Sequence, residues 1–78
     1  MKIINIETNK ILEEQYVRDL FLEFETDDIL DNWGDFKDGH LDIVSKCDKL
    51  KKINTMEIEQ VIYELNTFWA CEFEIINS

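Results

Sequence analysis

The sequence predicts a small α+β domain in which helices predominate and the two terminal strands form a two-stranded sheet resting on them. Two long segments place apolar residues at helical spacing, and both ends of the chain have the character of strands. The 78 residues include no proline and only two glycines, so residues that break helices are scarce. An all-α fold with frayed ends is the alternative, because an uncovered two-stranded ribbon is marginally stable in water.

The size and composition of the chain predict a single domain over residues 1–78. Hydrophobic residues make up 45% of the sequence, including two Trp, two Tyr and five Phe. This content is sufficient for a core despite the net charge of −10, although a chain of this length buries less of its surface than a larger domain does.

The N-terminal half begins with an isoleucine-rich segment, residues 2–7, that lacks helical spacing and favours a strand. Thr8 or Asn9 can cap the helix expected to follow. Its core face consists of Leu12, Tyr16, Val17, Leu20, Phe21 and Phe24. This periodicity predicts an amphipathic helix.

The apolar spacing slips after Phe24. A straight continuation would place three unpaired carboxylates on the core face, where burial is costly. They belong to Asp27, Asp28 and Asp31, whereas the apolar residues shift to Ile29, Leu30 and Trp33. We therefore expect a helix break near Glu25–Thr26, with Thr26 capping a second, short helix that ends near Trp33–Gly34.

The central loop spans residues 34–40 and contains a turn at Asp38–Gly39. Beyond it, Leu41, Val44, Cys47 and Leu50 are spaced as on a helix, with a strand beginning at Leu41 as the alternative.

The C-terminal part predicts one more helix and a strand. Asn54 and Glu57 have the spacing of a capping box. The helical core face that follows is Ile58, Val61, Ile62, Leu65 and Phe68, and the alternating residues after it are Trp69, Cys71, Phe73 and Ile75. Alternation is typical of a half-buried strand, and its only obvious partner is the N-terminal strand. The sequence leaves open whether the strands pair within one chain or between two.

Negative charge is concentrated in the middle of the chain. The acidic residues between positions 19 and 42 are Asp19, Glu23, Glu25, Asp27, Asp28, Asp31, Asp35, Asp38 and Asp42. Only Lys37 opposes these nine, which leaves a local charge of −8, whereas residues 45–52 carry four lysines and one aspartate. A charge of −10 repels nucleic acid and anionic membranes and attracts basic partners.

On a short helix, Asp28, Asp31 and Asp35 would share one face, with neighbours about 5–6 Å apart between Cβ atoms. Such a row of carboxylates suits a basic groove built for phosphates. The competing interpretation is a solvated face that keeps a small protein soluble.

Motifs for catalysis and metal binding are missing from the sequence. Counted from Asp31 or from Gly34, the central segment does not place ligands as a helix–loop–helix calcium site requires. His40 is the only histidine and has too few companions for zinc, and no nucleophile with a matching base can be assembled. We expect no enzyme activity, no cofactor and no metal, with Cys47 and Cys71 as packed, reduced thiols.

The N-terminus lacks the apolar run of a secretory signal, and no stretch approaches 18 apolar residues. We therefore expect a cytoplasmic protein, in the host cytoplasm if a phage encodes it, with no contact to membrane and none directly to nucleic acid.

These features predict a stoichiometric inhibitor that binds the basic surface of a nuclease or another nucleic-acid-binding protein. In type of protein, not in any residue motif, the chain resembles the small acidic proteins that phages and mobile elements direct against host nucleases, including anti-restriction and anti-CRISPR proteins that mimic DNA. The predicted partner-binding residues are Glu23, Asp27, Asp28, Asp31, Trp33, Asp35, Phe36, Asp38 and Asp42. An immunity protein or antitoxin against a toxin nuclease, and an adaptor that binds through apolar residues, are the alternatives.

Overall fold

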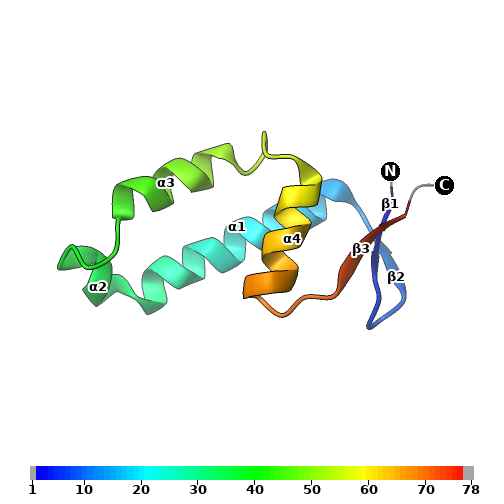
Figure 1. Cartoon of the computed structure of the whole chain (residues 1–78), viewed down its shortest axis with the longest axis horizontal. Coiled ribbons are helices and arrows are strands. Elements are labelled where there is room, and N and C mark those ends of the chain that lie inside the picture. The colour runs from blue at the N-terminus through cyan, green and yellow to red at the C-terminus, as the bar shows by residue number, and fades with distance from the viewer. Residues whose placement is uncertain (1, 77–78) are drawn as a thin grey trace.

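The computed structural model describes residues 2–76 as an elongated α+β domain with principal extents of 47 × 24 × 16 Å. Its elements are β1 (Lys2–Asn5), β2 (Lys10–Leu12), α1 (Glu14–Asp31), α2 (Trp33–Lys37), α3 (Ile43–Lys52), α4 (Ile58–Phe68) and β3 (Phe73–Ile76). The sheet lies at one end of the long axis and α2 at the other (Figure 1). The predicted fold class is confirmed.

The sheet has three antiparallel strands in the order β2-β1-β3, so the expected pairing of the terminal strands is present, and it forms within one chain. The third strand was not predicted. Where we expected a helix cap, Asn9 adopts a positive φ of 64°, and the side chain of Asn5 accepts the backbone N–H of Glu7 at 3.0 Å. The chain therefore turns back and pairs residues 10–12 with β1 before a helix begins.

Helix α1 runs unbroken from Glu14 to Asp31, which makes the predicted break at Glu25–Thr26 wrong. Thr26 caps nothing; its hydroxyl donates to the carbonyl of Leu22 at 2.7 Å. The break was predicted because Asp27, Asp28 and Asp31 would otherwise lie unpaired on the core face. In the structure Asp27 and Asp31 are exposed, and Asp28 is half-buried and paired with Lys46. The carboxylate that is buried is Glu25, at 3% exposure, and lysines of α3 neutralise it.

The expected core positions of Leu30 and Trp33 are also wrong, because both side chains are exposed. Trp33 begins α2 instead of ending a helix, and Gly34 lies inside α2. The predicted turn at Asp38–Gly39 is present, with Gly39 at a φ of 82° that favours glycine.

Helix α3 confirms the helical interpretation after the loop and excludes a strand from Leu41. Asp42 is its N-cap and accepts the Ser45 backbone N–H at 3.1 Å and the Ser45 hydroxyl at 2.9 Å. At α4, in contrast, the expected capping box does not form. Glu57 occupies the N-cap without a side-chain cap, and Asn54 accepts a hydrogen bond from Gln15 of α1.

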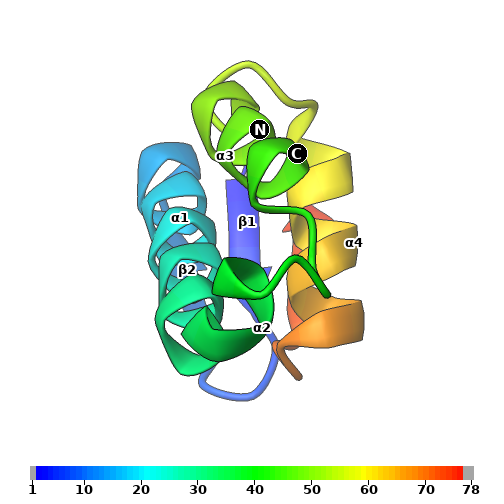
Figure 2. The ribbon, with the colours of Figure 1, turned by 90° about the vertical axis from the view of Figure 1, so that its left-hand side faces the viewer.

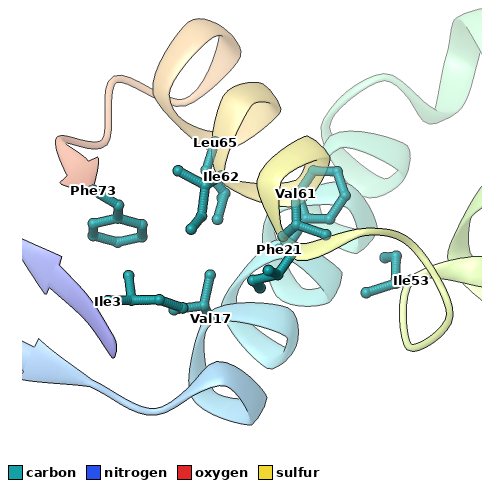
Figure 3. Packing of buried hydrophobic residues seen from close by; sticks show 9 residues of the cluster. Ile3, Val17, Phe21, Ile53, Val61, Ile62, Leu65 and Phe73 are labelled. Atoms are coloured by element: carbon teal, nitrogen blue, oxygen red, sulfur yellow. The ribbon is translucent and has the colours of Figure 1, made fainter. Parts of the chain in front are cut away.

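The core lies between α1, α4 and the inner face of the sheet (Figure 3). Seen along the long axis, α1 and α4 stand in front of the sheet, with α3 at the top of the view between them (Figure 2). The buried apolar residues of this cluster are Ile3, Val17, Phe21, Ile53, Ile58, Val61, Ile62, Leu65 and Phe73. The predicted core faces of α1 and α4 are thus largely confirmed.

Two predicted core positions and the start of the C-terminal strand differ. Phe68 and Tyr16 are exposed. The C-terminal strand begins at Phe73 and not at Trp69, because Ala70 adopts a φ of 55° and turns the chain between α4 and β3.

Candidate functional site

Four carboxylates follow one another along the outer surface of α1. Asp19, Glu23, Asp27 and Asp31 are all exposed and lie four residues apart. With a rise of 1.5 Å per residue, successive members are separated by about 6 Å along the helix axis, and the whole series spans about 18 Å. We call these four residues the acidic stripe.

The acidic stripe has no internal counter-charge. Within residues 2–76, none of its members forms an ion pair with lysine, arginine or histidine. The side-chain amide of Gln15 donates a hydrogen bond to Asp19 at 2.9 Å, but this contact adds no charge. The four negative charges therefore face solvent uncompensated, although like charges four residues apart destabilise a helix.

Two lysines of α3, Lys46 and Lys49, pair with carboxylates outside the acidic stripe. Lys46 contacts Glu25 and lies 2.8 Å from Asp28, whereas Lys49 lies 3.4 Å from Glu25 and 2.5 Å from Glu64 of α4. We call these five residues the charge cluster. Its three acids and two lysines nearly balance inside the fold, so the unpaired charge is left on the outside of α1.

Burial and pairing act in opposite directions on the pKa of Lys46. Burial alone lowers this pKa, but hydrogen bonds and charge interactions with Asp28 and Glu25 outweigh it, and the net pKa is raised above its ordinary 10.5. Because the pKa of Lys46 is higher in the folded than in the unfolded state, its charge stabilises the fold fully at a pH below the unfolded-state pKa. This stabilisation is lost as the pH rises through the folded-state pKa.

Stability is therefore expected to fall as the pH rises above the ordinary lysine pKa of 10.5, partly through deprotonation of Lys46. Urea unfolding at pH 9 and pH 11 measures this loss. Lys46→Arg is the matched control, because arginine keeps its charge throughout this range and the decline should be shallower. Equal declines in the wild type and the arginine variant would contradict the assignment.

Two of the predicted partner-binding carboxylates have structural roles. Asp28 accepts hydrogen bonds from Lys46 and from the Asn32 side chain, the latter at 3.0 Å. Asp42 caps α3, and the hydrogen bond from the Ser45 backbone N–H leads the causes that lower its pKa. Both are therefore engaged with their own chain.

The expected row of Asp28, Asp31 and Asp35 does not exist on one short helix. Asp35 belongs to α2, where its carboxylate lies 3.6 Å from the His40 ring, and Asp28 turns toward Lys46. The predicted residues that do share one face are Glu23, Asp27 and Asp31. Asp38 is exposed at the C-cap of α2.

Asp19 was not among the predicted partner-binding residues, although its four-residue spacing to Glu23 is visible in the sequence. The i, i+4, i+8, i+12 series from Asp19 to Asp31 was interrupted by the assumed break in the helix. Once α1 is continuous, this series forms the acidic stripe.

The two aromatic candidates differ in exposure. Phe36 is buried, but Trp33 is 54% exposed at the start of α2. Leu30, three residues earlier on α1, is 68% exposed. Leu30 and Trp33, which we call the apolar corner, lie at the end of the acidic stripe next to Asp31.

Two hollows lie beside α3, with volumes of about 410 and 310 Å³. The larger is lined by Ser45, Asp48, Lys49, Lys52 and Met56, and the smaller by Asp28, Phe36, Leu41, Asp42, Ser45, Lys46 and Lys49. Lys46 and Lys49 are already bound to carboxylates of the charge cluster. Throughout residues 2–76, no three His, Cys, Asp or Glu side chains are grouped to hold a metal ion.

None of the helices described is long and apolar enough to cross a membrane. No protein-family model, curated protein or solved structure matches the chain. The candidate site is therefore defined by its own geometry and charge.

Proposed function

We propose that this protein is a stoichiometric inhibitor that presents the acidic stripe to the basic, nucleic-acid-binding surface of a nuclease or a related protein. One observation carries the proposal: four carboxylates that form no ion pair within residues 2–76 recur about every 6 Å along a continuous helix. A series of negative charges at this spacing suits a groove whose lysines and arginines normally contact phosphates.

The scaffold holds the stripe in a fixed arrangement before binding. On the opposite side of α1, Val17 and Phe21 are fully buried in the core, and Glu25 is held by two lysines of α3. Because the helix is already ordered, binding does not have to order the carboxylates, which favours affinity. Complementary charge should also accelerate association and make it sensitive to salt.

The apolar corner supplies a second kind of contact. Tryptophan is enriched among the residues that dominate binding energy, and such residues are commonly surrounded by polar contacts that exclude water. Trp33 and Leu30 are exposed next to Asp31. We infer that the partner surface combines a basic groove with an adjacent apolar pocket.

The expected result is that neutralising the stripe abolishes capture of a nucleic-acid-binding protein. The test variant is Glu23→Gln, Asp27→Asn and Asp31→Asn combined, used as bait in host lysate at low and at physiological salt. Wild-type bait should retain a protein that duplex DNA displaces, and the association rate with the purified partner should fall at least about tenfold in the variant.

A matched control removes the same charge elsewhere. Glu57→Gln, Glu59→Gln and Glu72→Gln change exposed residues outside the stripe and should leave binding largely intact. Equal binding by both triple variants, or an affinity insensitive to salt, would overturn the electrostatic proposal.

Two other functions remain as alternatives to this proposal. An immunity protein or antitoxin would use the same surface against a toxin nuclease, and a toxin gene beside this one would favour it. Exposure of Leu30 and Trp33 favours an adaptor that binds through apolar contacts. Full binding by the stripe variant would support the adaptor.

A further inference from the structure

The sheet has one covered face and one uncovered face. Helices α1 and α4 pack on the side that carries Ile3 and Phe73, both buried. The opposite side forms the end of the molecule, and no described helix or strand lies beyond it (Figures 1 and 2).

Isoleucines occupy much of this uncovered face. Side chains alternate along strands, so the register places Ile4 beside Ile11 on the side opposite Ile3, with Ile76 one step further along β3. Ile11 is 57% exposed, and Ile6, just beyond β1, is also exposed. A solvated face of an antiparallel sheet is normally polar. We call Ile4, Ile6, Ile11 and Ile76 the isoleucine face.

The charges on this face are few, unlike those of the rest of the chain. Within the three strands, the charged residues that share the face are Lys2 and Glu74, and Glu72, whose carbonyl accepts the N–H of Ile6, adds one more negative charge just before β3. Two copies that each carry −10 repel one another over most orientations. At this face, Lys2 gives each copy a cation that can pair with Glu74 of the other.

We infer that the isoleucine face binds a second copy of this chain and forms a two-fold symmetric dimer. In a two-fold interface, the same patch serves both copies, so the patch has to be complementary to itself. Four isoleucines together with Lys2 and Glu74 satisfy this requirement.

The strand register indicates how two such faces would meet. Lys2 lies two residues along β1 from Ile4, about 7 Å away, and Glu74 lies one strand across from Ile4, about 5 Å away. A two-fold axis through Ile4 that bisects these two directions brings Lys2 opposite Glu74 of the second copy. The strands of the two sheets then cross at about 90°, which is one of the two usual arrangements of packed sheets.

The edges of the sheet are less suitable for self-association. Strands β2 and β3 contain three and four residues, and short edge strands are a common protection against pairing between chains. Edge pairing of two β3 strands would also bring Glu72 and Glu74 close to their own copies.

The dimer does not depend on the proposed inhibitor function. The acidic stripe runs along α1 away from the sheet, and about 25 Å separates the two ends of that helix. A dimer through the isoleucine face therefore leaves both stripes accessible.

Sedimentation equilibrium of the full chain should give a mass twice that of one chain. Ile11→Lys should weaken dimerisation at least about tenfold, because it places a charge inside an apolar contact, beside Ile4. Val44→Lys, at an exposed apolar residue on the outside of α3, is the matched control and should remain dimeric. Circular dichroism confirms that each variant is folded.

A charge exchange tests the orientation of the two copies. Lys2→Glu and Glu74→Lys should each weaken the dimer, and the two combined should restore it. A monomeric wild type, a dimer that resists Ile11→Lys, or an assembly larger than a dimer would overturn the inference. Failure of the combined exchange to restore the dimer would overturn the orientation.

Discussion

Lys46→Met is expected to lower the free energy of unfolding by about 3–5 kcal/mol, a large part of the stability of a domain of this size. The substitution leaves Glu25 buried at 3% exposure with Lys49 as its remaining cation, 3.4 Å away and shared with Glu64. An inadequately paired buried carboxylate loses its hydration without adequate compensation. Urea unfolding followed by circular dichroism measures the change.

A double variant separates the cost of an unpaired charge from the loss of packing. Glu25→Leu combined with Lys46→Met replaces the pair by apolar side chains of similar size and should recover most of the lost stability. Asp28 then retains Asn32 as a donor and part of its solvent exposure, and Lys49 retains Glu64. A double variant less stable than Lys46→Met alone would contradict the assignment of the loss to an inadequately paired carboxylate.

Phe21→Ala is expected to lower the free energy of unfolding by about 3–5 kcal/mol. Phe21 is fully buried in the core between α1 and α4 (Figure 3). Lys49 also lies over its ring, with Nζ 5.3 Å from the centroid, so truncation would remove a contact of the charge cluster. Denaturant midpoints at pH 7 provide the measurement.

Tyr16→Ala provides the control on the same helix. Tyr16 is exposed, and its truncation should change the free energy of unfolding by less than about 0.5 kcal/mol. Similar losses for both variants would show that the effect follows helix propensity and not burial.

The charge cluster and the acidic stripe result from one division of charge. Acidic residues on the core side of α1 receive lysines from α3, whereas those on the outer side receive none within the described chain. The function proposed for the stripe therefore depends on the fold, because α3 determines which carboxylates stay unpaired.

The sequence by itself determined the α+β class, the pairing of the terminal strands, the core faces of α1 and α4, and the excess of acid in residues 19–42. Each of these follows from periodicity or composition over a short segment. Such patterns arise because apolar side chains are buried and charged side chains stay in water, whichever other segment the helix or strand packs against. The four-residue spacing of the acidic stripe, from Asp19 to Asp31, is visible in the sequence.

Only the tertiary structure decided that α1 is continuous, that residues 10–12 form a strand, and that Lys46 and Lys49 face inward. Glu25 is separated from Lys46 by 21 residues and Glu64 from Lys49 by 15, so no local pattern reveals either pair. The cost of burying a carboxylate depends on whether a cation arrives from elsewhere in the fold. The helix was expected to break near Glu25–Thr26 because Asp27, Asp28 and Asp31 would lie unpaired on the core face, but Asp27 and Asp31 stay exposed and Asp28 is paired with Lys46.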